Sequence, residues 1–147
     1  MPSVTLRRAS DADAQILFDW RNDPDTRRNS RHSEAVGWDD HRRWLSAALA
    51  RSDRTLLIAE LAGEPVGTVR LDRGAEGCEL SWTVAPRWRG RGVGRTMVQK
   101  AAEESGAAVL LAAVREGNLS SARIAEGCGF IRSGEQDGFI LYRRGTP

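Results

Sequence analysis

The segment Arg89–Gly94, which reads RGRGVG, combines the residue types of a backbone loop that binds anions. Its glycines let the backbone approach a ligand closely. The apolar spacing over 93–104 predicts that a helix follows, so the loop amides lie at a helix N-terminus. There, unpaired N–H groups and the helix dipole favour a phosphate. Arginines at 87, 89, 91 and 95 add positive charge, with no acidic residue between Pro86 and Lys100. We therefore expect this segment to bind a pyrophosphate.

The spacing of the glycines excludes two common nucleotide sites. A dinucleotide fingerprint needs G-x-G-x-x-G at the opening of a βαβ unit, whereas this chain has G-x-G-x-G after several antiparallel-looking strands. No G-x-x-x-x-G-K-[ST] phosphate loop occurs in the sequence. The alternative is a turn that only connects a strand to a helix, but the arginines, the glycines and the helix start together favour the anion site.

Hydrophobic periodicity predicts the elements that position this loop. Alternating or apolar runs bounded by turn residues predict strands over 4–8, 55–61, 66–71, 78–84, 130–132 and 138–142. Helical spacing predicts helices over 12–22, 39–50, 93–104 and from Asn118 or Ser120 to about 128. The polar stretch 25–37 is expected to be a loop with a short helical piece. In the second of these helices we expect Trp44, Leu45, Ala48 and Leu49 to face inward. The continuous apolar run 107–114 predicts a strand covered on both faces.

Composition limits the class of protein. A chain of 147 residues with 40% hydrophobic residues fits one domain, over 1–147, with a genuine core. A net charge of +2 is too small to indicate nucleic acid as the partner. Two cysteines, Cys78 and Cys128, are too few and too far apart for a disulfide framework or a metal site. Because no signal peptide or membrane-spanning run is evident, we expect a cytoplasmic protein with no membrane partner.

Two motifs together carry a family resemblance. Val84-x-Pro86 and then Arg89-x-x-Gly92-x-Gly94 resemble the acyl-CoA signature of the GNAT superfamily of N-acetyltransferases. A second landmark of that family, Asn118-x-x-Ser121 followed by Gly129-Phe130, stands at the expected separation, so the resemblance covers nearly the whole chain. It implies a mixed α/β (α+β) GNAT-like fold. In that fold a central, mostly antiparallel sheet of about seven strands is flanked by helices and splayed between strands 4 and 5.

The resemblance also assigns roles to residues that bind the co-substrate, acetyl-CoA. Loop amides would hold the pyrophosphate, from Arg89, Gly90, Arg91, Gly92, Val93, Gly94, Arg95 and Thr96. Val84 would offer backbone groups to the pantetheine and its N–H to the thioester carbonyl, where such a donor stabilises developing negative charge. Asn118 would contact the pantetheine arm, cap the following helix, or do both. No metal is expected.

Acetyl transfer in this family proceeds by direct attack of an amine on the thioester, without a covalent acyl-enzyme. Many members place a tyrosine seven residues after the Asn to protonate the thiolate, but here that position is Ala125. Ser121 matches a subset resembling ribosomal-protein N-acetyltransferases and is the first candidate for this role, ahead of Tyr142 and Cys128. Glu79, on the fourth strand, is the candidate general base, with His41 and His32 as alternatives. Packing, capping or solvent exposure is the competing interpretation for each.

The acceptor site should lie in the first two helices and the loop between them. Trp20, Arg21 and Asn22, together with His41, suit a sugar or nucleotide, because aromatic faces stack and guanidinium groups bind a diphosphate. This pairing resembles a branch that acetylates nucleotide-linked amino sugars, and the competing interpretation is a core Trp20 with solvated neighbours. Two further functions stay open: acetylation of a protein α-amine, and a non-catalytic acyl-CoA sensor. The expected partners are acetyl-CoA and a small-molecule amine, and an exposed closing strand is a candidate homodimer edge.

Overall fold

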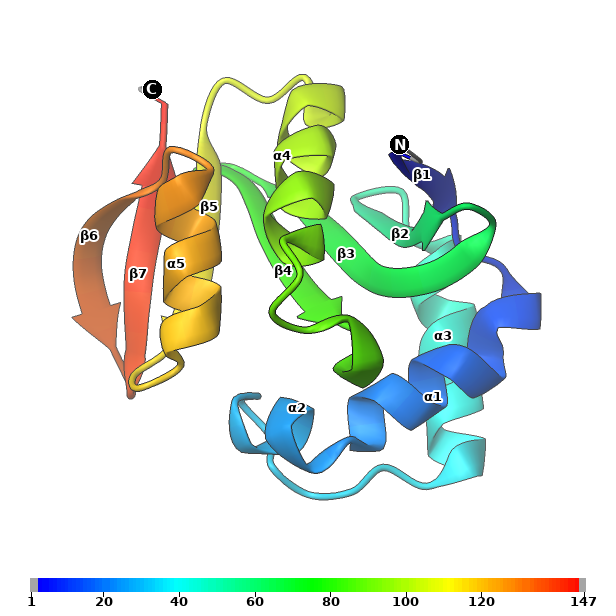
Figure 1. Cartoon of the computed structure of the whole chain (residues 1–147). Coiled ribbons are helices and arrows are strands. Elements are labelled where there is room, and N and C mark those ends of the chain that lie inside the picture. The colour runs from blue at the N-terminus through cyan, green and yellow to red at the C-terminus, as the bar shows by residue number, and fades with distance from the viewer. Residues whose placement is uncertain (1–2, 146–147) are drawn as a thin grey trace.

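The computed structural model describes residues 3–145 and places seven strands in one sheet, with helices on both faces (Figure 1). In chain order the elements, in which η marks a 3₁₀-helix, are β1 (Val4–Arg8), η1 (Asp11–Asp13), α1 (Ala14–Asn22), α2 (Pro24–Arg28), α3 (Trp38–Ala50), β2 (Arg54–Leu61), β3 (Glu64–Gly74), β4 (Gly77–Val84), η2 (Pro86–Trp88), α4 (Val93–Ser105), β5 (Leu110–Arg115), α5 (Leu119–Gly127), β6 (Ile131–Gln136) and β7 (Phe139–Arg144).

The sheet has the strand order β1-β2-β3-β4-β5-β7-β6. Neighbouring strands are antiparallel except β4 and β5, which are parallel and pair only through Cys78 with Leu110 and Glu79 with Leu111. Beyond these two pairs, β4 continues to Val84 and β5 continues to Arg115 without pairing with each other. The two strands therefore diverge toward their C-terminal ends. Figure 1 shows this opening between the two strands. The expected mixed fold, with its splay between strands 4 and 5, is confirmed.

Two apolar clusters fix the helices on the sheet. α4 and α5 cover one face, where Met97 and Val98 are fully buried in a cluster with Val69 and Leu80. α1 and α3 pack on the other face, where Leu45 and Ile58 are the most buried members of a smaller cluster. The helices on the second face contact β2, near one side of the sheet, and leave β5 uncovered there.

Two expectations about burial are wrong. β5 begins at Leu110, and its side chains alternate between buried and half-buried, because helices cover only the face that carries Leu110, Ala112 and Val114. Trp44 is 40% exposed, because the buried stripe of α3 consists of His41, Leu45 and Ala48 and Trp44 falls beside it. Within residues 3–145, none of the helices is long and apolar enough to cross a membrane.

Candidate active site

The glycine loop presents a run of free backbone amides at the start of α4. The amide of Arg89 donates to the Pro86 carbonyl (3.4 Å), and the amide of Thr96 donates to the Gly92 carbonyl (3.3 Å). Between them, the amides of residues 90–95 have no acceptor anywhere in residues 3–145. Gly90 and Gly92 adopt the left-handed conformation, with φ of 76° and 78°, which a residue with a side chain rarely takes. Consecutive unpaired amides at a helix N-terminus form a binding site for an anion.

The third glycine of the loop has a packing role. A Cβ atom at Gly94 would lie 2.5 Å from Ile124 Cδ1 on α5 and 2.9 Å from Val84 Cγ2 on β4. Only a glycine therefore lets the first turn of α4 pack this closely against both elements. Gly94 fixes the loop beside the end of β4, where the strands diverge.

The backbone of β4 directs two amides into the opening between β4 and β5. In an antiparallel pair, residues alternate between bonding the partner strand and pointing away from it. Ala85 donates to Val66 on β3 (2.8 Å), and Cys78 donates in the other direction, to Val109 (3.0 Å). β3 and β4 keep a continuous register, so the amides of Trp82 and Val84 share the direction of Cys78. Because pairing with β5 ends at Glu79, these two amides face the diverging region.

The loop arginines bind neighbouring residues of the protein. Arg89 Nη2 donates to Asp23 Oδ2 (2.9 Å) and to Thr26 Oγ1 (3.1 Å), so its guanidinium group faces α2. Burial alone raises the pKa of Asp23, but hydrogen bonds from Arg89 and from the Thr26 amide outweigh it, and this pKa lies below the usual range. The guanidinium carbon of Arg91 lies 5.2 Å from the centre of the Trp88 ring. The Arg89 side chain therefore positions α2, while its loop keeps the free amides.

Asn118 caps α5 and leaves the Ser121 hydroxyl free. The Asn118 Oδ1 accepts from the Ser121 amide (3.3 Å), which confirms the expected cap. Ser121 is half-buried, and its hydroxyl makes no hydrogen bond within the described part of the chain. Both residues follow β5 directly, on the far side of the opening from Val84.

Tyr142 and Cys128 lie in the core beneath α5. The Tyr142 hydroxyl donates to Glu126 Oε2 (3.2 Å), and burial, together with this carboxylate, raises the pKa of Tyr142. Cys128 is 4% exposed, its Sγ donates to the Arg95 carbonyl (3.4 Å), and burial raises the pKa of the thiol. The side chains of both residues are engaged in packing and hydrogen bonds. Of the three candidates for the thiolate role, only Ser121 has a side-chain group without a hydrogen-bond partner among residues 3–145.

Glu79 lies at the closed end of the opening. It pairs in register with Asp72 and Leu111, where the two strands are still joined. Five residues of strand separate it from Val84, roughly 16 Å at about 3.3 Å per residue. A carboxylate there cannot directly accept a proton from an amine that attacks a thioester held at Val84. Glu79 shares its sheet face with Ser81 and Thr83, opposite α4 and α5.

His41 and Trp20 are core residues. His41 is 2% exposed, its Nε2 lies 3.0 Å from the Ala14 carbonyl oxygen, and burial lowers its pKa. The contact with Ala14 fastens α3 to α1, and the ring also stacks on Trp44 of its own helix, with ring centres 5.9 Å apart. Trp20 is 7% exposed and packs in the smaller cluster. The burial of the ring and its contact with the Ala14 carbonyl favour a packing role for His41, and the base or ligand role stays a prediction.

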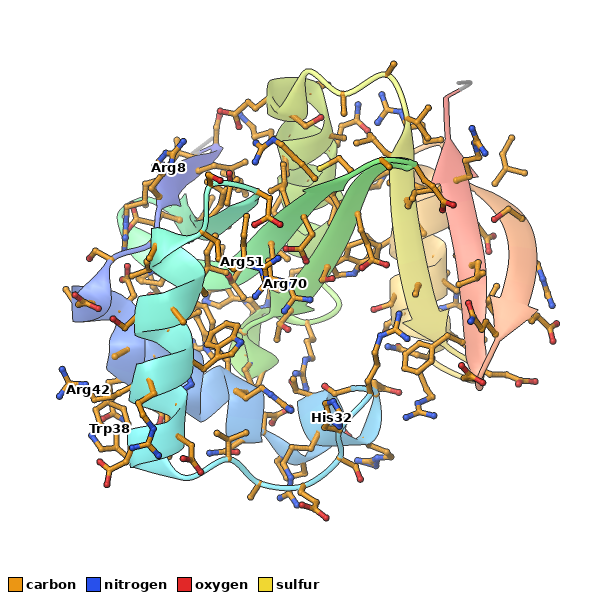
Figure 2. The ribbon with its side chains drawn as sticks, turned by 180° about the vertical axis from the view of Figure 1, so that it is seen from behind. Arg8, His32, Trp38, Arg42, Arg51 and Arg70 are labelled. Atoms are coloured by element: carbon orange, nitrogen blue, oxygen red, sulfur yellow. The ribbon has the colours of Figure 1, made fainter. Side chains whose placement is uncertain are left out.

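Arg21 and Asn22 hold the segment that joins α2 to α3. Asn22 Nδ2 donates to the Val36 carbonyl (2.9 Å), and the Val36 amide donates back to Asn22 Oδ1 (2.8 Å). Arg21 Nη2 donates to the His32 carbonyl (3.1 Å). Figure 2 shows His32 on this segment, at the lower end of the view, and Arg70 higher up on the sheet. Both the Nδ2 and the Oδ1 of the Asn22 side chain are bonded to Val36, and these bonds position the segment.

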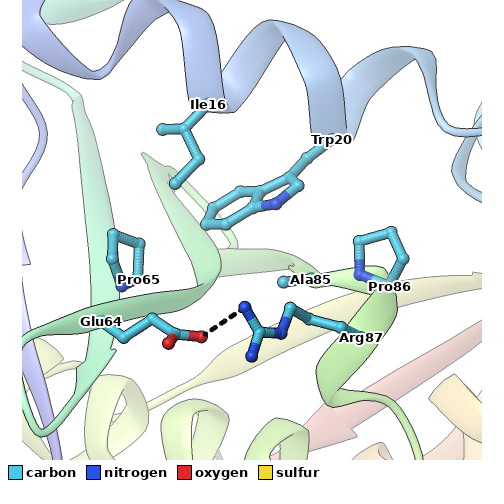
Figure 3. A pocket seen from close by; sticks show the side chains of 7 residues that line it. All are labelled: Ile16, Trp20, Glu64, Pro65, Ala85, Pro86 and Arg87. Atoms are coloured by element: carbon cyan, nitrogen blue, oxygen red, sulfur yellow. Dashed lines mark ion pairs between the residues drawn. The ribbon is translucent and has the colours of Figure 1, made fainter.

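Two surface cavities are lined by residues outside the glycine loop. One, of about 500 Å³, is bordered by Trp20, Ile16 and Ala85, and an ion pair between Arg87 and Glu64 (3.4 Å) crosses its floor (Figure 3). The other, of about 680 Å³, lies at the opposite end of β4, around the turn 73–78 and residues 107–109. Over residues 3–145, no group of three or more metal-binding side chains comes together.

Comparison with known proteins gives the family. The sequence model of the family described as acetyltransferase (GNAT) domain matches residues 3–131 of the chain. No curated protein sequence matches the chain. Among solved structures, ribosomal-protein-alanine N-acetyltransferase from Brucella melitensis is 25% identical, with a TM-score of 0.78, covering 97% of this chain and 99% of that one. AAC(6')-Ib in complex with ribostamycin and coenzyme A is 23% identical, with a TM-score of 0.83 and coverage of 97% and 93%.

A third similar structure is spermidine N-acetyltransferase from Vibrio cholerae in complex with CoA and spermine. It is 18% identical, with a TM-score of 0.82, covering 96% of this chain and 93% of that one. The family model covers most of the chain, and the chain belongs to the GNAT acetyltransferase family. Its class is thus that of the GNAT acetyltransferases.

Proposed function

We propose that this chain, as a single domain, moves the acetyl group of acetyl-CoA to a primary amine by direct attack in a ternary complex. The run of free amides over residues 90–95 carries this proposal. These amides bind the pyrophosphate, and the pantetheine arm enters between β4 and β5, alongside Asn118. The thioester carbonyl accepts from the Val84 amide, and the Trp82 amide, two residues earlier on the same strand edge, faces the pantetheine arm.

In the reaction, the amine nitrogen forms a bond to the thioester carbon and the carbon–sulfur bond breaks. Negative charge develops first on the carbonyl oxygen, where the Val84 amide stabilises it. The Ser121 hydroxyl then donates a hydrogen bond to the departing thiolate. The amine proton leaves through water, since Glu79 is too distant for direct transfer, and Glu79 serves at most as the far end of that chain.

For the acceptor, we propose a nucleotide-linked amino sugar. A protein α-amine is the alternative, supported by Ser121 and by the similarity to ribosomal-protein-alanine N-acetyltransferase. A non-catalytic acyl-CoA sensor is a third possibility, motivated by Ala125 in place of the tyrosine. A panel of amines, assayed by release of free CoA thiol, separates the three. A sensor binds acetyl-CoA and releases no thiol with any of them.

The coenzyme site is tested by Gly92→Val, with Gly106→Val as its matched control. Both glycines have positive φ (78° and 67°) and open space around them, but Gly92 begins α4 and Gly106 ends it. Both variants carry similar backbone strain, so the comparison isolates the loop. We expect Gly92→Val to weaken coenzyme A binding at least tenfold in calorimetry, while Gly106→Val binds normally. Equal affinities would exclude the loop as the pyrophosphate site.

A further inference from the structure

Three arginines from three different elements donate to the carbonyls of one short segment, residues 30–33. Arg115 Nη2, at the end of β5, donates to the Ser30 carbonyl (2.8 Å). Arg21 Nη2, on α1, donates to the His32 carbonyl (3.1 Å), and Arg27 Nε, on α2, donates to the Ser33 carbonyl (3.0 Å). We call these three residues, together with Arg31 within the segment, the arginine cluster.

The arginine cluster has no acidic partner in the described part of the chain. None of its four members forms an ion pair there, and the guanidinium carbons of Arg31 and Arg115 each lie 4.6 Å from the centre of the Phe139 ring. The two acids of the neighbouring helix are already used, because Asp23 pairs with Arg89 and Asp25 pairs with Arg28. Four positive charges therefore converge without a compensating negative charge.

Two donors of the cluster are buried and unsatisfied. Arg21 Nη1 and Arg115 Nε are both shielded from solvent and have no hydrogen-bond partner. Burial and the neighbouring charge of Arg27 lower the pKa of Arg21. Leaving a charged donor buried without an acceptor is costly. An anion bound at the solvent-facing parts of exposed Arg31 and of half-buried Arg21 and Arg115 supplies the missing negative charge.

The cluster lies where an acceptor molecule would approach the thioester. Arg115 ends β5, across the opening from Val84, and its side chain shares the sheet face of Glu79 and Thr83 by register. This face is opposite α4 and α5, which cover the coenzyme side. The segment after α2 passes the lower end of the sheet in Figure 2, where His32 is labelled, and Arg115 reaches its Ser30 carbonyl.

We propose that the arginine cluster binds a phosphate or diphosphate group of the acceptor, so that the substrate is a phosphorylated or nucleotide-linked amine. This inference rests on the proposed acetyl transfer and names the residues that bind the phosphate of its acceptor. Planar guanidinium groups match phosphate oxygens in pairs. Polyamines and aminoglycosides carry several positive charges and are repelled by the cluster, although proteins of similar fold bind ribostamycin and spermine.

The test compares glucosamine with glucosamine 6-phosphate as acceptors at saturating acetyl-CoA. We expect kcat/KM for thiol release to be at least tenfold higher with the phosphorylated sugar, and spermidine to be the poorest acceptor. In Arg31→Gln, which loses no hydrogen bond to the protein, this preference falls severalfold. Arg43→Gln, on α3 and paired with Asp40, is the control with the same loss of charge and keeps the full preference.

A binding measurement separates this inference from the proposed function. Glucose 6-phosphate, which has no amine, is titrated into protein saturated with coenzyme A, so that the pyrophosphate loop is already occupied. Binding of glucose 6-phosphate but not glucose, weakened by Arg31→Gln, supports the cluster even if no amine is acetylated. Equal turnover of both glucosamines, or equal binding of both glucoses, would overturn it while leaving acetyl transfer intact.

Discussion

The link between Arg89 and Asp23 should control how firmly α2 is held. α2 contributes no buried residue, so polar contacts must hold it in place. Arg89 is 34% exposed and Asp23 17% exposed, and the pair is joined at 2.9 Å with a further bond to Thr26 Oγ1. Charged hydrogen bonds contribute about 1.5–3 kcal/mol and exposed ion pairs less than about 1 kcal/mol. Discounting for exposure, Arg89→Gln should weaken the docking of α2 by about 1–1.5 kcal/mol.

That free energy corresponds to roughly a 5- to 12-fold change in the local opening equilibrium. Hydrogen exchange measures this opening equilibrium at the amides of Arg27 and Asn29, which donate to the carbonyls of Asp23 and Asp25. We expect their exchange to accelerate by that factor in Arg89→Gln, with exchange in α3 unchanged. Arg87→Gln is the control, because Arg87 is 75% exposed and pairs with Glu64 only at 3.4 Å.

A double-mutant cycle completes the test. Asp23→Asn removes the charge but keeps a residue that caps a helix well, so its effect reports the ion pair. The two substitutions together should cost little more than either alone. The pKa of Asp23 is lowered, so the link is fully present above about pH 4 and is lost as pH falls through the lower, folded-state pKa. Unchanged exchange at Arg27 in Arg89→Gln, or strictly additive effects, would refute the reasoning.

Three further predictions follow from the site. Val84→Pro removes the amide that faces the opening and no bond to β3, so kcat should fall about 10²- to 10³-fold with the fold retained by circular dichroism. Ser121→Ala should lower kcat about 10- to 100-fold. Tyr142→Phe loses only the hydrogen bond to Glu126, so it should lower the free energy of unfolding by about 1 kcal/mol and leave kcat unchanged. Burial lowers the pKa of His41, so stability should fall as pH drops below about 6.5, and His41→Gln should flatten this slope.

The co-substrate side of the molecule could be predicted from sequence because it is built locally. The loop, the helix behind it and the strand before it are consecutive in the chain, and glycines at 90 and 92 indicate backbone geometry directly. The cap by Asn118 is equally local. The exposure of Trp44 and the bare face of β5 were predicted wrongly, because both depend on where helices from elsewhere in the chain pack.

The acceptor side could not be predicted in the same way. Arg89 belongs to the glycine motif by sequence, yet its partner Asp23 comes from a distant helix, and no local pattern links the two. Arg115 and Phe139 belong to no motif in the sequence. Only the pairing of their strands brings them together, where Arg115 contacts the Phe139 ring and donates to the Ser30 carbonyl. Of the four residues predicted there, Trp20 and His41 pack in the core and Asn22 holds the segment after α2, while Arg21 belongs to the arginine cluster.

The two sides meet in α2. Arg89 ties its first turn to the glycine loop, and Arg27 and Arg115 tie the segment after it to the arginine cluster. A helix without buried residues responds to such polar links more than to the core. In the proposed complex the loop amides bind the pyrophosphate, and we expect the loop to become more rigid and the Arg89 bond to Asp23 to transmit this change to α2. The order in which the substrates bind is therefore expected to be acetyl-CoA first, and Arg89→Gln should make acceptor binding independent of coenzyme A.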